Sequence, residues 1–385
     1  MRSINYSSGT PIFIKLIGFA RRNGKKDRDM SDPVNEFEAA FRDKIGAKYA
    51  IAVNSGTSAL HAALVACNVK GCEVITTALC PAMDTFAIIH AGGTPVFADV
   101  DPLTHLVTAD TIAKCITERT KAIIVVHLHG LSCDMEPILK LADAHALLVI
   151  EDCAQSMLAT YNDRYVGTIG HFGCFSFERK KHMTTGSEGG MIVTSDTGLK
   201  FDRQVKSDET LAIAARKFAG IGYKHMTAEA GRTSLDASVY QRPDYERFDT
   251  IGLNYRMSHV QAEIGLQKLK TIDVVVSQRR EIGYLWQFVF GESCQPHLYN
   301  AHNAFYTAAF PYMGDWQDLY NRFNAAGGDG FYAMPQCPYH EPALKHLFAE
   351  APVAEELQKT LVLMKTHYPI MSHVNRQTRI MASVL

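Results

Sequence analysis

The 385-residue sequence lacks an excess of charge of either sign, a long apolar run and a paired-cysteine motif. Its formal net charge is −1, whereas nucleic-acid-binding proteins usually carry a clustered basic excess. Only the run from Arg21 to Arg28 is basic. We interpret it as part of a solvated N-terminal arm over residues 1–32, with a phosphate-binding patch as the alternative. We therefore expect no nucleic-acid partner.

The apolar stretch from Pro11 to Ala20 is interrupted by Lys15 and is shorter than the ~20 residues of a membrane span. It also precedes the basic run, whereas a signal peptide carries its positive charge first. The nine cysteines are scattered through mostly apolar segments, which favours buried thiols in a reducing compartment over disulfides or a metal site. We expect a cytoplasmic protein without a metal ion and without membrane contact.

What the sequence does contain is an alternation of short apolar segments with amphipathic ones. The apolar runs end at turn residues and predict strands at 49–53, 73–76, 94–97, 122–127 and 147–150. The segments around them predict helices at 34–45, 58–67, 85–91, 109–115 and 135–144. Strands separated by helices imply βαβ units. We therefore expect an α/β fold whose large domain has a mostly parallel sheet flanked by helices.

The second half of the chain departs from this rhythm. Residues 173–194 predict a strand, a polar loop and another strand, and residues 205–250 predict an extended excursion. A long helix over 258–281 leads towards a smaller α+β domain with predicted elements at 304–311 (strand), 316–325 and 354–363 (helices). The predicted parts are an N-terminal arm (1–32), a large domain (33–258) and a connecting helix with a small C-terminal domain (259–385).

Two polar motifs lie where predicted strands end. Residues 56–58 (Gly-Thr-Ser) open a helix, and backbone N–H groups and hydroxyls there suit a phosphate, although Ser and Thr are also common helix caps. Asp152 follows another strand, where ligands of open α/β sheets bind. A carboxylate at that point pairs well with a protonated ring nitrogen of a cofactor. Glu151 precedes it and should point to the opposite face, because strand side chains alternate.

Lys181 lies in a polar loop shortly after the strand that ends at Ser176-Phe177 and before a glycine-rich segment at 186–190. A lysine that forms a Schiff base must be accessible, partly desolvated and near groups that lower its pKa. Taken alone, Lys181 and the neighbouring Lys180 are typical of a solvated charged run. Only the order of all these motifs along the chain gives Lys181 its significance.

In that order, the motifs resemble the DegT/DnrJ/EryC1/StrS sugar aminotransferases. This family has the fold of the type I, aspartate-aminotransferase-like enzymes that use pyridoxal 5′-phosphate (PLP). The resemblance covers residues 36–270 and is loose beyond about residue 280. The matching segments are VNSGTSAL (53–60), GTPVFADVD (93–101), VVHLHG (125–130), IEDCAQS (150–156), FSFERKK (175–181), TTGSEGG (184–190) and LNYRMS (253–258).

The resemblance implies a PLP-dependent aminotransferase. Lys181 would hold PLP in a Schiff base (the internal aldimine) and then move the proton between substrate and cofactor. Asp152 would bind the pyridinium nitrogen, and Gln155 would lie near the ring hydroxyl. The amino group would come from glutamate or glutamine, pass through the pyridoxamine form (PMP), and reach a ketone on a nucleotide-linked sugar or a related polyol.

The same resemblance implies how the phosphate is held. Gly56 and Thr57 from the helix start would bind it together with Ser176 from a neighbouring strand end, and the helix-start motif adds Ser58 to the expected cofactor-binding residues. Asn254 would reach the phosphate of the adjacent subunit, so that the active unit is a homodimer with composite sites.

The sequence departs from the family pattern at three places. Many members stack an aromatic residue on the cofactor where this chain has Leu79-Cys80-Pro81, so Leu79 or Pro81 is the expected cover. Ser187 is inserted into the family's Thr-Gly-Glu-Gly-Gly motif. Residues 227–245 are longer than in typical members and are either a substrate loop or an inter-subunit contact. Further substrate candidates, with core packing as the alternative, are Tyr332, Tyr339 and His340.

Several alternatives compete with this interpretation. Lys180 is the competing Schiff-base lysine. His182 matters because relatives that replace the lysine with histidine are PLP- or PMP-dependent sugar dehydratases; an aminocyclitol (inosose-type) ketone is an alternative acceptor. A zinc site at His127-x-His129 would need both side chains on one strand face and a third ligand. A Rossmann dehydrogenase is not favoured, because no G-x-G-x-x-G follows an early strand.

Overall fold

The computed structural model describes residues 32–195, 208–229, 237–291 and 300–385. The basic run at 21–28, Cys294 and the Gly-Arg-Thr-Ser segment at 231–234 lie outside these ranges, so the predictions made for them are not addressed. Within the described ranges, no helix combines the length and the apolar character needed to cross a membrane.

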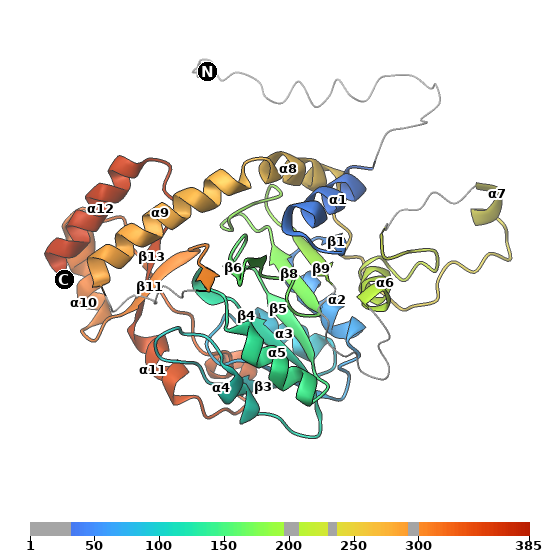
Figure 1. The fold of residues 1–385 in the computed structure, drawn as a ribbon, viewed down its shortest axis with the longest axis horizontal. Helices are drawn as coiled ribbons and strands as arrows, with labels where there is room; N and C mark the ends of the chain where they lie inside the picture. Colours follow the sequence, from blue (N-terminus) through green and yellow to red (C-terminus); the bar gives the residue numbers. More distant parts are fainter. Residues whose placement is uncertain (1–31, 196–207, 230–236, 292–299) are drawn as a thin grey trace, which may run out of the picture. The chain divides into compact units, whose positions relative to one another are not determined.

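The central sheet has seven strands and is mostly parallel, as predicted (Figure 1). Strands β3, β2, β4, β5 and β8 run parallel to one another, and β9 runs antiparallel to both of its neighbours, β8 and β1. Most of these strands are buried on both faces, which explains why they appear in the sequence as continuous apolar runs. In sheet order they are β1 (Tyr49–Val53), β9 (Gly190–Thr194), β8 (Phe172–Ser176), β5 (Leu148–Asp152), β4 (Thr120–Val126), β2 (Glu73–Thr77) and β3 (Thr94–Ala98).

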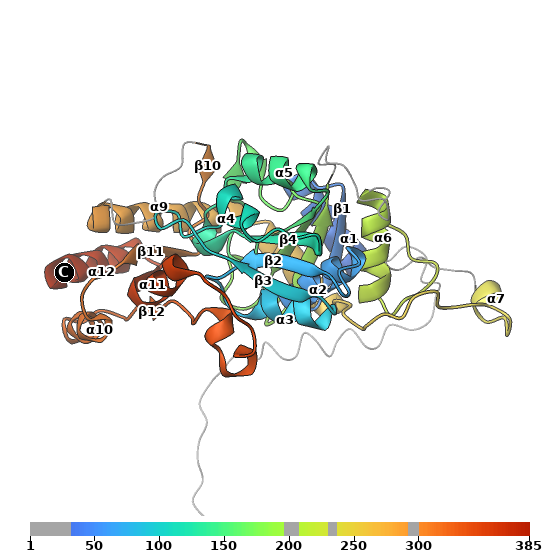
Figure 2. The same cartoon turned by 90° about the horizontal axis from the view of Figure 1, so that it is seen from below.

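Helices cover both faces of this sheet. Figure 2 shows α2 and α3 on one face of the parallel strands and α4 and α5 on the other. Local signals set the ends of α1, where the Asp32 side chain accepts from the Val34 N–H (2.9 Å) and Gly46 closes the helix at φ 72°. The helices of this part are α1 (Pro33–Ile45), α2 (Gly56–Ala66), α3 (Met83–His90), α4 (Ala109–Ala113), α5 (Met135–Ala144), α6 (Asp208–Ala219), α7 (Ala237–Tyr240) and α8 (His259–Leu269).

The prediction for residues 205–250 is wrong in part, because α6 is a regular helix that packs against α2. Its buried apolar side chains form a narrow face that is easily missed in a polar sequence: Leu211, Ala212, Ala215, Phe218 and Ala219. A buried ion pair fixes α6 to α1, with Arg216 Nη1 3.0 Å from Glu38 Oε2.

The C-terminal part has its own buried cluster, which includes Trp286, Phe310 and Phe323. A three-stranded antiparallel sheet of order β11-β13-β12 packs there with helices. Small strands pair elsewhere as β10-β6-β7. The elements are α9 (Ile272–Phe290), α10 (Trp316–Ala325), α11 (Pro352–Thr360), α12 (Met371–Val384), β6 (Thr160–Tyr161), β7 (Arg164–Tyr165), β10 (Ala301–His302), β11 (Thr307–Pro311), β12 (Tyr332–Ala333) and β13 (Leu361–Lys365).

Two predicted helices are wrong in their extent. The single helix expected over 258–281 is divided into α8 and α9, because Thr271 donates both its amide (3.1 Å) and its hydroxyl (3.2 Å) to the Lys268 carbonyl and interrupts the ladder. The helix expected over 354–363 ends at Thr360, and Leu361 begins β13, the central strand of the small sheet. The domain division at residue 258 stays a prediction.

Candidate active site

A cavity of about 600 Å³ lies at the carboxyl ends of three adjacent strands of the central sheet. Val126, Asp152 and Ser176 line it, and each is the last residue of its strand, β4, β5 and β8 respectively. The N-terminus of α2 and residues 332–335 contribute further walls. Ligands of open α/β sheets bind in this position, and the volume lies within the roughly 300–1,000 Å³ of small-molecule sites.

Lys181 lines this cavity from the loop that joins β8 to β9. Its Nζ lies 4.7 Å from the centroid of the Tyr306 ring, a cation–π contact. Burial lowers the pKa of Lys181, and the negative charge of Asp152 opposes part of that change. Desolvation favours the neutral amine, the form in which lysine acts as a nucleophile.

Lys180 also lines the cavity but is exposed, whereas Lys181 is half-buried. The loop turns tightly here, with the Lys181 N–H donating to the Glu178 carbonyl (2.9 Å) and the Lys180 N–H donating to Glu178 Oε2 (2.9 Å). The difference in burial favours Lys181 as the reactive amine, since the charged form of Lys180 keeps its contact with water.

Asp152 is nearly buried, and one of its oxygens is already held. Its Oδ1 accepts from the Ala154 N–H (2.8 Å), which orients the carboxylate towards the cavity. Burial raises the pKa of Asp152, while the Ala154 N–H and the positive charge of Lys181 act in the opposite direction. The neighbouring Glu151 points elsewhere, as predicted, and accepts from the N–H groups of Gly167 (2.7 Å) and Ile169 (2.8 Å).

Three of the four residues predicted to bind phosphate lie together at the start of α2. Gly56 and Thr57 line the cavity beside Ser176. A Cβ at Gly56 would lie 2.7 Å from Ser176 Cβ, so only glycine lets the helix start approach the end of β8 this closely. Ser58 does not line the cavity; its hydroxyl donates to Asn54 Oδ1 (2.7 Å) inside the turn. It therefore belongs to the capping network of α2.

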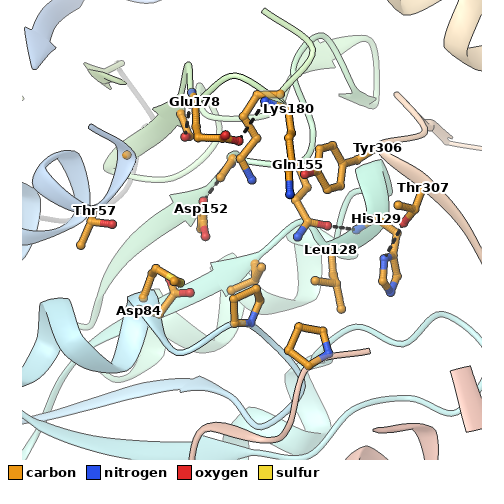
Figure 3. Close-up of a pocket in the computed structure, with 18 of the residues that line it drawn as sticks. Thr57, Asp84, Leu128, His129, Asp152, Gln155, Glu178, Lys180, Tyr306 and Thr307 are labelled. Atoms are coloured by element: carbon orange, nitrogen blue, oxygen red, sulfur yellow. Dashed lines mark hydrogen bonds between the residues drawn. The ribbon is translucent and has the colours of Figure 1, made fainter. Parts of the chain in front are cut away.

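Gln155 lines the cavity next to the 3₁₀ turn that follows β4. Its Oε1 accepts from the His129 N–H (2.9 Å), and His129 Nδ1 lies 3.0 Å from Thr307 Oγ1 (Figure 3). His129 adopts φ 62°, and burial lowers its pKa well below the usual range, so the ring is neutral. This turn joins the large sheet to β11 at the cavity.

The zinc hypothesis required His127 and His129 to share a strand face. That geometry is wrong, because β4 ends at Val126 and the two rings have different partners. His127 Nε2 lies 2.9 Å from Glu151 Oε2, and its Nδ1 accepts from the Cys133 N–H (3.1 Å). His127, Glu151 and Cys153 cluster closely enough to bind a metal ion. Both nitrogens of His127 are nevertheless used by protein groups, so a hydrogen-bond network explains the cluster.

Asp84 is a cavity residue that the sequence reasoning missed. It lies in the first turn of α3 and is 1% exposed, and Figure 3 shows the Asp152 side chain directed towards it. The available signal was an acid three residues after Pro81, in the segment that departs from the family pattern. Tyr306 was also missed, because its contact with Lys181 joins distant parts of the chain.

The remaining candidates divide between cavity and core. Pro81 lines the cavity, whereas Leu79 is fully buried outside it. Tyr332 lines the cavity, whereas the Tyr339 ring packs in the core, 5.2 Å from the ring of Phe97. Two candidates lie elsewhere and are exposed: Asn254, whose Oδ1 accepts from Arg256 Nε (3.0 Å), and His340.

These groups fit one type of cofactor. An amine, a buried carboxylate and a helix N-terminus that approaches a strand end meet at the carboxyl edge of a doubly covered sheet. They match an aldehyde, a ring nitrogen and a phosphate, which PLP combines in one molecule. The fold and the site together define the aspartate-aminotransferase-like class of proteins.

Comparison with known proteins identifies the family within this class. The model of the DegT/DnrJ/EryC1/StrS aminotransferase family matches residues 23–384, and the chain belongs to that family. The X-ray structure of the aminotransferase from Psychrobacter cryohalolentis is 29% identical, with a TM-score of 0.79 over 92% of this chain and 91% of that one. The sugar aminotransferase CalS13 from Micromonospora echinospora shares the fold, with a TM-score of 0.80, 24% identity and 92% coverage of both chains.

Two curated relatives are closely similar over part of their length. GDP-perosamine synthase of Caulobacter vibrioides is 40% identical over 248 residues, which are 64% of this chain and 59% of the relative. The UDP-N-acetyl-3-dehydro-alpha-D-glucosamine 3-aminotransferase of Acidithiobacillus ferrooxidans is 43% identical over 164 residues, which are 42% of this chain and 44% of the relative. The matched part of the chain thus spans about three-fifths of the first relative and less than half of the second.

Proposed function

We propose that this protein is a PLP-dependent aminotransferase that moves the amino group of glutamate or glutamine to a ketone of a nucleotide-linked sugar. The observation that carries the proposal is the half-buried amine of Lys181, which shares one cavity with Asp152 and the start of α2. Burial lowers the pKa of Lys181 and so favours the neutral, nucleophilic amine.

Each group has a defined task in this proposal. Bound PLP supplies an electron sink for the negative charge that develops at the α-carbon of the amino donor. Lys181 Nζ takes the proton from that carbon and later returns a proton to the acceptor. Asp152 keeps the ring nitrogen protonated, and the N–H groups of Gly56 and Thr57 bind the phosphate at the positive end of α2.

The substrate class is inferred from the relatives and from the shape of the cavity. The printed names of the two curated relatives refer to a GDP-linked and a UDP-linked sugar. The cavity lining includes Tyr332, Met334 and His367, from the C-terminal part of the chain. Tyr332 is 43% exposed, so its ring is accessible to the apolar face of a sugar or a base.

We also propose a homodimer with shared sites. Asn254 is exposed outside the cavity, as a residue that reaches a neighbouring subunit must be. It follows an exposed apolar segment in which Phe248 is 52%, Ile251 98% and Leu253 44% exposed. Exposed apolar side chains that cluster in this way favour a protein interface. The described cysteines are all free thiols, which supports a reducing, cytoplasmic compartment.

The absorption spectrum of the purified protein with PLP tests the proposal. Lys181→Ala should abolish the visible band of the lysine-bound cofactor and all turnover, while the matched control Lys180→Ala leaves both largely intact. L-glutamate or L-glutamine should bleach the band in the wild type as the cofactor accepts the amino group. The reverse result for the two lysines would move the Schiff base to Lys180. A band that neither donor alters would contradict amino transfer.

Alternative reactions are separated by the acceptor. A sugar dehydratase is disfavoured because Lys181 is present at the cavity, while His182 lies outside it with Nε2 3.0 Å from the Ala304 carbonyl. An aminocyclitol ketone remains the alternative acceptor for amino transfer. Nucleotide-linked keto sugars and inosose-type ketones should be compared as acceptors with the PMP form of the protein. Turnover of the inosose alone would exclude the nucleotide-sugar assignment.

A further inference from the structure

The cavity contains a second buried acid besides Asp152. Asp84 is 1% exposed and Asp152 is 9% exposed, and the two carboxyl groups influence each other, since Asp152 raises the pKa of Asp84 and Asp84 lowers that of Asp152. They come from different elements, the first turn of α3 and the last residue of β5, and both line the cavity. Figure 3 shows the Asp152 carboxyl group directed towards Asp84. A hydrogen bond between two carboxyl groups requires a proton on one of them.

The surroundings decide which acid carries this proton. Among the described residues, the buried Asp84 Oδ1 has no hydrogen-bond partner, whereas Asp152 Oδ1 accepts from the Ala154 N–H. The backbone N–H of Asp84 and the Cys80 thiol lower the pKa of Asp84, but burial, the largest effect, outweighs them. The charged and titratable groups that face the pair are Lys181 from the β8–β9 loop, His127 beyond the end of β4, and the thiols of Cys80, Cys153 and Cys174. Burial raises the pKa of Asp84 well above its usual range, and the charge of Asp152 adds to the effect.

We propose that Asp84 is a positioning residue that keeps its proton and donates it in a hydrogen bond to Asp152, so that Asp152 alone carries the negative charge that faces the cofactor ring. The proposal rests on the PLP site proposed above. Asp152 then accepts from two protein donors, the Ala154 N–H and the Asp84 carboxyl group. Both stabilise its ionised form and lower its affinity for a proton.

The consequence concerns the proton between Asp152 and the ring nitrogen. If the Asp84 donor is removed, Asp152 becomes more basic and draws that proton away from the ring. A hydrogen bond to a charged group corresponds to about tenfold to a hundredfold in such an equilibrium. Asp84→Asn keeps a donor, because the amide N–H₂ replaces the carboxyl O–H. Asp84→Leu has a similar size and no donor, and Asp84→Ala is a second variant without one.

The ring nitrogen can be observed directly with nitrogen-15-labelled PLP and NMR. In the wild type and in Asp84→Asn, the nitrogen signal should be that of a protonated ring. In Asp84→Leu or Asp84→Ala, it should move towards the unprotonated position. Thr85→Val, a buried change in the next residue of α3 that does not line the cavity, is the matched control and should leave the signal unchanged.

Two NMR outcomes would overturn the proposal. Equal shifts in the Asn and Leu variants would mean that Asp84 acts through a negative charge, and no shift in any variant would mean that it does not influence Asp152. Infrared spectroscopy of the PLP-free protein provides a test that does not depend on cofactor binding or on the folding of the Leu and Ala variants. The wild type should show the band of a buried, protonated carboxyl group that Asp84→Asn lacks. Absence of that band from the wild type would refute a protonated Asp84. Failure of the wild type to bind PLP would refute only the proposed function.

Discussion

Gly56→Ala tests whether the close approach of α2 to β8 forms the phosphate site. The new Cβ would lie 2.7 Å from Ser176 Cβ and 3.2 Å from Ser176 Oγ. Non-bonded carbon atoms prefer about 3.5–4.0 Å, so the start of α2 has to retreat by roughly 1 Å. Neither backbone can move without disrupting regular structure, because Ser176 ends a buried strand and Gly56 begins a helix.

The expected cost has two parts. Overpacking of a tight contact costs about 1–3 kcal/mol of unfolding free energy. A displacement of roughly 1 Å in a binding constellation costs up to about a hundredfold, so PLP affinity should fall by roughly one to two orders of magnitude. If these N–H groups bind the phosphate as proposed, PLP affinity should fall by more than the loss of unfolding free energy accounts for.

PLP affinity is measured by equilibrium dialysis and stability by urea unfolding of the PLP-free protein. The control is Gly56→Ala combined with Ser176→Gly, which removes the opposing Cβ and hydroxyl. This double variant should recover stability but not full affinity, because it also removes the Ser176 hydroxyl proposed to bind the phosphate. Wild-type affinity and stability for Gly56→Ala alone would refute the reasoning, since the contact would then be neither tight nor near the phosphate.

Three further predictions follow from other contacts. Arg216→Met leaves the carboxylate of Glu38 buried without its partner, the two side chains being 3% and 5% exposed, and should cost about 3–5 kcal/mol in urea unfolding; a loss below 1 kcal/mol would contradict this. Burial lowers the pKa of His171 from 6.5 to about 4, and its Nδ1 accepts from the Val149 N–H (3.0 Å). The unfolded state therefore binds more protons, so the contribution of neutral His171 to the unfolding free energy is complete above pH 6.5 and declines towards pH 4. The decline should be about 2 kcal/mol between pH 7 and pH 5. A His171→Gln variant should lack this pH dependence, and an unchanged dependence of stability on acid pH in the variant would refute the assignment. Asn254→Ala should weaken PLP retention if the site is composite, and unchanged PLP affinity in a dimer by sedimentation would argue against that role.

The sequence predicted several elements well because their signals are local. Strand β1 and helices α5 and α10 have the predicted bounds, since apolar periodicity and turn residues act over only a few positions. Predictions were wrong where an apolar segment owes its structure to pairing with elements distant in the sequence. The apolar residues 361–364 fit a helix face equally well until β11 and β12 pair with them on both sides.

The candidate site likewise contains residues that the sequence predicted and contacts that only the folded structure revealed. Lys181, Asp152 and the Gly56-Thr57 turn follow strand ends, and parallel strands bring such ends to one edge, so the sequence alone determined that they meet. Only the tertiary structure decided that Ser58 turns inward to Asn54, that Tyr306 lies beside the lysine, and that a second acid meets Asp152. Side-chain direction and contacts between elements distant in the chain leave no periodic trace, and they are fixed only when the elements pack.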